Sequence, residues 1–286
     1  ALLHTGQHYD EAMSSSIISQ IFNKKPNFFL NSGGKDEISM ITHIMEQMKN
    51  LFEKINPNYV MVYGDTTSTL AAALATKIKK IPLIHVESGV RNYDINMPEE
   101  FNRLTVDRIS DINICATKHN YENLRLEAFA TKQISSRLSL CGDLMFDCFK
   151  FFDPRVSNDL SEIFNFNNLK IDDYILCTIH RQSNVDDENA LKNIVKALNN
   201  INSSIPVLIP LHHRTRDRLK QFNLELNCCV IDPVSYLDSL KLIRNCKFVI
   251  TDSGGLVREA YFSKKLSLTI SIEKVVWPEI NFLKAS

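Results

Sequence analysis

Two neighbouring runs of sequence bring acids to the point where an apolar segment ends: His85-Val86-Glu87-Ser88-Gly89-Val90-Arg91 and Met97-Pro98-Glu99-Glu100-Phe101-Asn102-Arg103. The apolar segment is Ile81-Pro82-Leu83-Ile84, which predicts a strand. In open α/β sheets, ligands bind at the carboxyl ends of the strands, so acids at this position are well placed for chemistry. The alternative is that the two acids after the proline only favour a helix N-terminus, and the motif alone leaves both interpretations open.

Outward from this stretch, short apolar runs alternate with longer amphipathic segments. In the first half, strands are predicted at 59–63, 83–86, 112–116 and 138–141, and helices at 66–80, 99–109 and 119–128. In the second half, strands are predicted at 174–179, 206–211, 228–231, 248–251 and 266–270, and helices at 187–200, 214–222, 236–244 and 256–262. A repeated strand-helix alternation is typical of a parallel sheet covered on both faces.

The alternation is interrupted between Phe146 and Leu169, where Asp153-Pro154 and an Asn-rich stretch occur. A chain of 286 residues with 44% hydrophobic content also favours two domains over one. We therefore predict an α/β protein with two Rossmann-like, doubly wound parallel-sheet domains, 1–149 and 150–286, that face a cleft.

Composition excludes several classes of partner. Lys plus Arg and Asp plus Glu both number 33, which gives no reason to expect nucleic acid or an anionic membrane as an electrostatic partner. No apolar run approaches the roughly 20 residues of a membrane-spanning helix, and no secretory signal is recognisable. Seven scattered cysteines without a C-x-x-C pair suggest buried thiols in a reducing compartment. We expect a cytoplasmic protein without a bound metal.

The chain starts with Ala1-Leu2-Leu3-His4-Thr5-Gly6, which has no initiating Met and resembles the tail of a strand. We therefore expect that the first strand-helix unit of the N-terminal domain is missing, and that the closing helices of the C-terminal domain are missing as well.

The run Thr251-Asp252-Ser253-Gly254-Gly255 follows a predicted strand and opens a predicted helix. Paired glycines let the backbone approach a ligand, and the free N–H groups of a helix N-terminus bind phosphate. Glu259 lies one to two turns further on, where a carboxylate could accept both hydroxyls of a ribose. The alternative is a tight turn in which Ser253 only caps the helix. The combination favours a nucleotide diphosphate site, and the absence of G-x-G-x-x-G disfavours a dinucleotide.

Two further strand ends carry polar residues. Asp65 begins a strand-to-helix turn, where capping alone would explain it, but it would share a crevice with Glu87 if their strands are neighbours. His180 and Arg181 follow the first strand of the second domain, where they suit a diphosphate or a proton transfer.

In chain order, a series of motifs resembles the non-hydrolysing UDP-N-acetylglucosamine 2-epimerase family. The motifs are Thr5-Gly6-Gln7-His8-Tyr9-Asp10, Gly64-Asp65-Thr66-Thr67-Ser68-Thr69, His85-Val86-Glu87-Ser88-Gly89, Met97-Pro98-Glu99-Glu100-Phe101-Asn102-Arg103, His180-Arg181, Pro210-Leu211-His212 and Thr251-Asp252-Ser253-Gly254-Gly255. Gly142-Asp143-Leu144-Met145 and Asp232-Pro233-Val234-Ser235-Tyr236-Leu237 also resemble the branch that acts on UDP-2,3-diacetamido-2,3-dideoxyglucuronate.

The resemblance implies a GT-B-like pair of Rossmann-type domains and inversion at C2 of a UDP-N-acetylated amino sugar, by elimination of UDP and re-addition to a glycal. It implies no cofactor, a role in supplying surface polysaccharide synthesis, and a homodimer. Asp65, Glu87, Glu99 and His180 match the family's catalytic residues. Arg103, Arg181, Ser253, Gly254, Gly255 and Glu259 match UDP-binding positions. Gln7, His8, Arg181 and His212 match positions that contact a second UDP-sugar acting as activator.

Two alternatives stay open from the sequence. A GT-B glycosyltransferase would share the fold and the nucleotide loop, but would need an acceptor and typically one base rather than several acids. A truncated remnant would bind UDP with impaired turnover.

Overall fold

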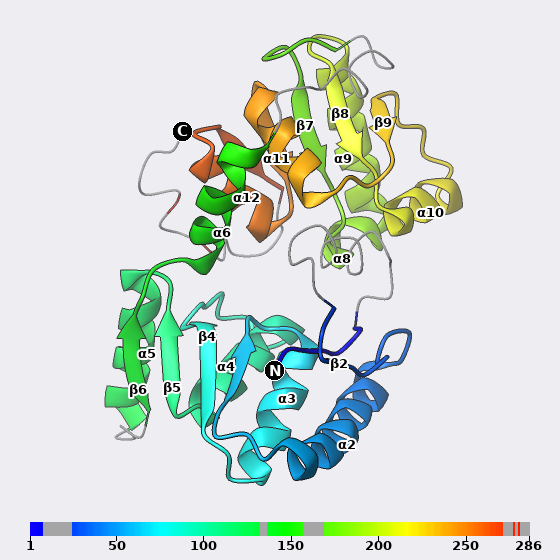
Figure 1. Ribbon diagram of the computed structural model, residues 1–286. Helices are drawn as coiled ribbons and strands as arrows, with labels where there is room; N and C mark the ends of the chain where they lie inside the picture. The colour runs from blue at the N-terminus through cyan, green and yellow to red at the C-terminus, as the bar shows by residue number, and fades with distance from the viewer. Residues whose placement is uncertain (8–24, 132–135, 157–168, 271–276, 278–279, 281–286) are drawn as a thin grey trace. The chain divides into compact units, whose positions relative to one another are not determined.

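The computed structural model describes residues 1–7, 25–131, 136–156, 169–270, 277 and 280 (Figure 1). The chain divides into two compact units, Ala1–Met145 and Phe146–Ser286. The division lies inside helix α6 (Leu144–Phe152), and each unit has its own parallel sheet.

The sheet of the first unit has four parallel strands in the order β3-β4-β5-β6. Strands β4, β5 and β6 run side by side in Figure 1, with helices next to them. In chain order the elements are β1 (Leu3–His4), β2 (Phe28–Phe29), α2 (Glu37–Ile55), β3 (Val60–Tyr63), α3 (Thr67–Ile78), β4 (Leu83–Ser88), α4 (Pro98–Ile109), β5 (Ile112–Cys115), α5 (Lys118–Thr131) and β6 (Arg137–Leu140). Strands β1 and β2 pair with each other as a separate parallel ribbon.

Helix α2 shows why the core of this unit forms. The Asp36 side chain accepts a hydrogen bond from the Ser39 N–H and caps the helix. The residues buried on α2 are spaced by four, Met40, Ile44, Met48 and Phe52, so they form one apolar stripe. This stripe packs with the small residues of α3 and with Leu83 and Val106 in one hydrophobic cluster.

The second unit contains a five-stranded parallel sheet in the order β11-β10-β7-β8-β9. Its elements are η2 (Asp153–Arg155), β7 (Ile175–Thr178), α8 (Gln182–Val185), α9 (Glu188–Asn202), β8 (Val207–Pro210), α10 (His213–Gln221), β9 (Cys229–Ile231), α11 (Tyr236–Asn245), β10 (Phe248–Thr251), α12 (Gly254–Phe262) and β11 (Ser267–Thr269). The chain leaves β7 toward β8 and leaves β10 toward β11, in opposite directions across the sheet. The carboxyl ends of β7 and β10 therefore meet at a topological switch point.

Strand β7 is buried on both faces. Tyr174 and Leu176 belong to one hydrophobic cluster, and Ile175 and Cys177 belong to another. Alternate side chains of a strand point to opposite faces, so the two clusters lie on the two sides of this sheet. This is why the strand has a continuous apolar sequence rather than an alternating one.

The predicted strands and helices listed for the two halves are found, with boundaries that shift by a few residues. The first part of the segment where the predicted alternation is interrupted, from Phe146, contains a helix that was not predicted. Leu144–Phe152 form a helix, because the rings of Phe146 and Phe149 pack, tilted by 50°, against Phe262 of α12. Helix α2 was also not predicted. Of the seven cysteines, Cys115, Cys177 and Cys246 are buried, but Cys141 and Cys148 are exposed, contrary to expectation.

Among the described residues, no helix combines the length and the apolar character needed to cross a membrane.

Gly89 provides a test of close packing behind β4. Its φ is +79°, and a Cβ there would lie 2.2 Å from the Asn120 carbonyl oxygen. Gly34 has a similar φ of +75° but no atom within 4 Å of its Cβ position. We expect Gly89→Ala to lower the free energy of unfolding by about 2–5 kcal/mol, from left-handed backbone strain plus overpacking.

The matched variant Gly34→Ala should lower the free energy of unfolding by only about 1–2 kcal/mol, since it carries the backbone strain alone. Urea unfolding followed by far-UV circular dichroism measures both. Equal losses in the two variants would contradict the packing assigned to Gly89.

Candidate active site

Asp65 and Glu87 lie at the carboxyl ends of neighbouring strands. In the β3–β4 pair, Tyr63 is in register with Val86 as the last pair, so Gly64 and Asp65 after β3 lie beside Glu87 at the end of β4, which stays paired with β5 through Ser88. The Gly64 N–H donates to the Val86 carbonyl oxygen at 3.0 Å. The sequence expectation that these two acids follow adjacent strands is therefore met by the register.

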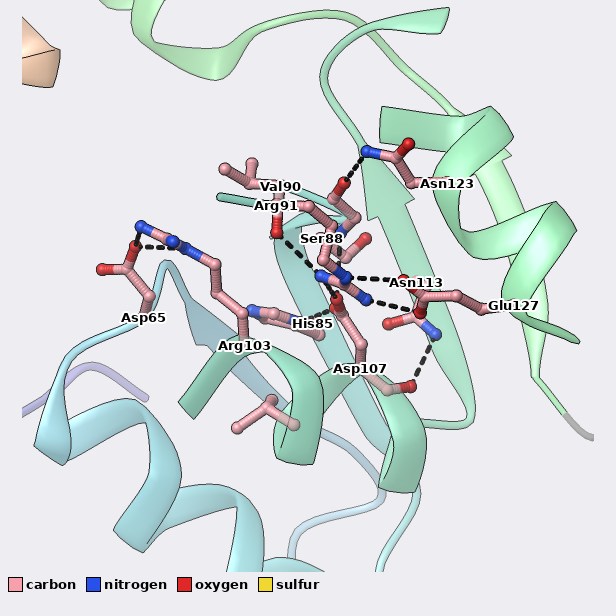
Figure 2. A network of polar contacts seen from close by, with 12 residues as sticks. Asp65, His85, Ser88, Val90, Arg91, Arg103, Asp107, Asn113, Asn123 and Glu127 are labelled. Carbon is pink, nitrogen blue, oxygen red and sulfur yellow. Dashed lines mark hydrogen bonds and ion pairs between the residues drawn. The ribbon is translucent and has the colours of Figure 1, made fainter. Parts of the chain in front are cut away.

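Arg103 of α4 holds Asp65. Its guanidinium donates to Asp65 Oδ2 from Nε at 2.8 Å and from an Nη at 2.6 Å, and the Asn102 amide donates to the Asp65 carbonyl oxygen at 2.8 Å. Figure 2 shows the Asp65–Arg103 pair beside the β3 end. Arg103 thus lies next to a predicted catalytic acid. A contact between Arg103 and UDP stays a prediction.

The two acids after Pro98 have different surroundings. Glu100 is buried and accepts hydrogen bonds from the backbone N–H groups of Asn92 and Tyr93 and from Arg103. Glu99 is half-buried, and within the described residues it has no ion pair. Glu100 therefore serves the loop and the helix start, whereas Glu99 is the acid that a ligand can reach.

Glu87 occupies strained backbone. Its φ is 69°, in the left-handed region that a non-glycine residue adopts only at a cost of about 1–3 kcal/mol. The strand pairing shifts between Val86 and Ser88, which marks a bulge at this residue. Bulges at the ends of strands redirect side chains, so the backbone aims Glu87 differently from the regular strand.

A chain of charged groups runs from buried His85 through buried Asp107 and Arg91 to partly exposed Glu127 (Figure 2). His85 Nδ1 is 2.7 Å from Asp107 Oδ1, and His85 Nε2 is 2.8 Å from the Gly64 carbonyl oxygen. The second oxygen of Asp107 accepts from Arg91 at 2.7 Å and from the Gly89 N–H at 3.1 Å. Arg91 also makes a two-pronged contact with Glu127, at 2.7 and 2.8 Å.

The pKa values of His85, Arg91 and Asp107 all shift in the direction that favours the charged form. Burial by itself would raise the pKa of Asp107, but its hydrogen bonds and charge contacts with His85 and Arg91 outweigh burial and lower it. Burial would likewise lower the pKa of His85, but the Asp107 contact outweighs it and raises the pKa. A compensated chain of alternating charges is the form in which ions can be buried at acceptable cost.

In the second unit, Asp252 ties the switch point together. Its carboxylate is 1% exposed and accepts from the backbone N–H groups of His180 at 2.9 Å and Arg181 at 2.8 Å. The Asn184 amide donates to it at 3.1 Å. One ring nitrogen of His180 lies 3.2 Å from the same carboxylate, while the His180 side chain is 45% exposed. The strand β10 end thus holds the strand β7 end in place.

The S-G-G turn forms the start of α12. Ser253 is the N-cap, and its hydroxyl accepts from the Leu256 N–H at 3.3 Å. A Cβ on Gly254 would lie 3.7 Å from the Trp277 indole nitrogen, and Arg258 stacks over the Trp277 ring at 4.3 Å. The capping interpretation of Ser253 is therefore confirmed. It is compatible with an anion at the remaining N–H groups of the helix N-terminus.

Glu259 is a buried carboxyl group in the next turn of α12. It is 6% exposed, and no hydrogen bond or ion pair reaches its carboxyl group from the described residues. Burial raises the pKa of Glu259 to about 7, against a small opposing effect of Arg258. A buried acid without a hydrogen-bond donor is costly, and such groups mark functional sites when a ligand supplies the donors.

The predicted activator residues have separate surroundings. The Gln7 side-chain oxygen accepts from the Ser68 N–H at 3.1 Å and from the Ser68 hydroxyl at 2.6 Å, at the start of α3. His212 caps α10 by accepting from the Arg214 N–H at 3.3 Å. His8 lies outside the described residues.

His85, Arg91 and Asp252 stand in the quoted sequence motifs, but no role was predicted for them. Asp107 was not singled out at all. A signal for Asp107 is present in α4. Glu100, Arg103 and Asp107 recur at helical spacing, and all three are buried, so the polar residues occupy the face that should be apolar. A polar stripe on a buried helix face indicates a polar network against the sheet.

Comparison with known proteins identifies relatives over most of the chain. The family profile described as UDP-N-acetylglucosamine 2-epimerase matches residues 1–279. A UDP-2,3-diacetamido-2,3-dideoxy-D-glucuronate 2-epimerase of Pseudomonas aeruginosa is 38% identical over 280 residues, 98% of this chain and 77% of that protein. A UDP-N-acetylglucosamine 2-epimerase of Methanocaldococcus jannaschii is 34% identical over 278 residues, 94% of this chain and 75% of that protein.

A solved structure agrees with these relatives. The crystal structure of the Methanocaldococcus jannaschii UDP-GlcNAc 2-epimerase in complex with UDP-GlcNAc and UDP has a TM-score of 0.87 and 32% identity, and the match covers 98% of this chain and 78% of that one. The predicted fold class, two Rossmann-like domains of the GT-B-like kind, is confirmed. The chain belongs to the UDP-N-acetylglucosamine 2-epimerase family.

Proposed function

We propose that this chain is an isomerase that inverts C2 of a UDP-N-acetylated amino sugar without net hydrolysis. A base removes the C2 proton while the bond between C1 and the UDP oxygen breaks, and UDP leaves with the bonding electrons. The intermediate is a 2-acetamidoglucal; a proton returns to the other face of C2 and UDP adds back to C1, which gives the C2 epimer of the UDP-sugar. The reaction serves surface polysaccharide synthesis.

The observation that carries this proposal is the pair of acids, Asp65 and Glu87, at the ends of paired strands in a chain of this family. Elimination and re-addition need groups that take and return protons at one carbon. Glu99 supplies a third acid that is open to a ligand. The orientation of Glu87 by strained backbone also supports a functional role, because strain of this kind is concentrated at active sites.

We assign UDP to the second unit. The N–H groups of Gly254 and Gly255 and the Ser253 hydroxyl suit the diphosphate, since a helix N-terminus carries partial positive charge, whereas the Ser253 N–H donates to the Thr251 hydroxyl at 2.9 Å. Glu259 suits the two ribose hydroxyls, which would supply the donors that its carboxyl group lacks. His180 and Arg181 suit the departing diphosphate, because both follow β7 at the switch point and are positioned by Asp252.

The identity of the sugar is drawn from the relatives. One of them is named for UDP-2,3-diacetamido-2,3-dideoxy-D-glucuronate and another for UDP-N-acetylglucosamine. Both sugars carry an acetamido group at C2, so the same elimination applies to each. We further propose that a second UDP-sugar contacts Gln7, His8, Arg181 and His212. We also propose that the protein forms a homodimer.

Proton exchange at C2 tests the reaction directly. The protein incubated in deuterated water with UDP-N-acetylglucosamine or with the diacetamido-glucuronate sugar should incorporate deuterium at C2, because the returned proton comes from solvent. Proton NMR of the recovered sugar measures this, with no acceptor present. Absence of exchange with both sugars would sink the proposed reaction, and product that forms only with an acceptor would indicate a transferase.

Asp65→Asn and Glu87→Gln should each slow C2 exchange by about 10²–10⁴-fold, the usual contribution of a general acid or base. UDP affinity should change by no more than about threefold, since these acids face the sugar. Isothermal titration with UDP and the exchange assay measure the two effects.

Glu53→Gln is the matched control for the acids, because Glu53 is an exposed acid of the same unit, paired with Lys79. It should leave both exchange and UDP affinity unchanged. A loss of UDP affinity as large as the loss of exchange would place Asp65 or Glu87 among the UDP contacts.

Glu259 should make UDP-sugar binding depend on pH. Only the ionised carboxylate accepts both ribose hydroxyls, and burial raises the pKa of Glu259 to about 7. The affinity for a UDP-sugar should therefore fall as the pH is lowered through about 7, and level off above it. Titration calorimetry across this range measures it.

Glu259→Gln should weaken UDP-sugar binding by about 1–3 kcal/mol above neutral pH and should abolish the pH dependence. The same pH dependence in the variant would assign the titration to another group.

A further inference from the structure

We propose, on the basis of the proposed function, that Asp107 is a positioning residue that holds both strand ends bearing Asp65 and Glu87, acting through a permanently protonated His85. Neither Asp107 nor His85 is proposed to touch the sugar. Their role is to keep two backbone segments in one relative geometry while the reaction proceeds.

The contacts of His85 determine how many protons its ring carries. Its Nε2 faces the Gly64 carbonyl oxygen at 2.8 Å, which can only accept, so Nε2 carries a proton. Its Nδ1 faces Asp107 Oδ1 at 2.7 Å. Asp107 Oδ2 lies 2.7 Å from the Arg91 guanidinium, whose permanent positive charge favours the ionised carboxylate over the neutral acid, and the Gly89 N–H also donates to this oxygen. Both ring nitrogens of His85 therefore donate, and the ring is an imidazolium.

The imidazolium holds the backbone next to Asp65 through its hydrogen bond to the Gly64 carbonyl oxygen. Gly64 is bonded on both sides: its carbonyl oxygen accepts from His85, and its N–H donates to Val86 at 3.0 Å. Asp65 is the next residue. With Gly64 held at both polar groups, the backbone that carries Asp65 cannot shift relative to strand β4 without breaking a buried hydrogen bond.

Asp107 also holds the backbone after Glu87 through the Gly89 N–H. The Gly89 N–H donates to Asp107 Oδ2 at 3.1 Å, on the far side of the bulge. The bulge residue Glu87, with its φ of 69°, thus lies between two segments that the same carboxylate holds, one through His85 and one through Gly89. Backbone strain persists only where surrounding contacts over-determine it, and these are such contacts.

Glu127 provides a control that separates this positioning role from simple stability. Asp107 is 4% exposed, and its carboxylate joins α4 to β4, whereas the outer member of the chain, Glu127, is 40% exposed at its side chain. Glu127 binds Arg91 through two hydrogen bonds, at 2.7 and 2.8 Å (Figure 2). The two acids therefore offer a matched pair: both bind Arg91, but only Asp107 contacts His85 and Gly89.

Asp107→Asn should lower kcat for C2 exchange by about 100-fold, as expected when catalytic groups are displaced by about 1 Å. The amide has one acceptor oxygen and cannot accept from His85, Arg91 and Gly89 together. KM and UDP affinity should change by no more than about threefold, because UDP is assigned to the other unit.

Glu127→Gln, which removes the same charge from the same arginine, should leave kcat within about threefold of the parent protein. Thermal unfolding of both variants records the stability loss separately. If Asp107→Asn and Glu127→Gln reduce kcat equally, or if the Asp107 variant loses UDP affinity as much as kcat, the positioning role is wrong.

A measurement on the unaltered protein keeps the proposal testable even if Asp107→Asn fails to fold. In ¹⁵N-histidine-labelled protein at about pH 8, NMR should show a histidine with protons on both ring nitrogens, although a free imidazole is neutral there. His85 is the buried histidine of the described residues, so its ring protons should exchange slowly. A single ring proton on His85 would overturn the proposal. Since this measurement needs no substrate, absent C2 exchange together with a doubly protonated His85 would count against the proposed function alone.

Discussion

Parallel strand pairing is the constraint on which the site depends. In a parallel sheet, all carboxyl ends lie at one edge, and register decides which residues leave the sheet together. The β3–β4 register brings Asp65 and Glu87 to the same edge, and the β7–β10 register does the same for the His180 and Ser253 segments. Residues more than 20 positions apart become neighbours by backbone hydrogen bonding alone, before any side chain is considered.

Each unit reinforces this pairing with a buried aspartate. Asp107 joins α4 to the β3 and β4 ends through a histidine ring, an arginine and a backbone N–H. Asp252 joins the β10 end to the β7 end through two backbone N–H groups and an asparagine. Hydrogen bonds to a charged group are about twice as strong as neutral ones, so a single carboxylate can hold several loop segments at once. The result is rigid backbone beneath polar residues that remain accessible.

The contrast with Glu259 is informative. Asp107 and Asp252 are buried with a full set of donors, and burial is compensated. Among the described residues, no donor reaches the Glu259 carboxyl group, and its burial raises its pKa. Carboxylates that the fold has satisfied hold the structure, whereas a carboxylate that the fold leaves unsatisfied favours a ligand rich in hydroxyl groups.

The sequence by itself determined the fold class and where the candidate site residues fall relative to the strands. Apolar runs alternating with amphipathic segments are local patterns, so the strands and helices were predictable, as were the acids that follow β3 and β4 and the S-G-G turn. Helix α6 was not, because its phenylalanines are ordered by packing against Phe262, more than 100 residues later. Only the tertiary structure showed that Glu100 is buried against the Asn92–Tyr93 backbone while Glu99 is half-buried, and only it revealed Asp107, His85 and Asp252 as organising residues. Those roles depend on which donors a buried carboxylate meets, and the donors come from strands and helices that become adjacent only when the sheet assembles.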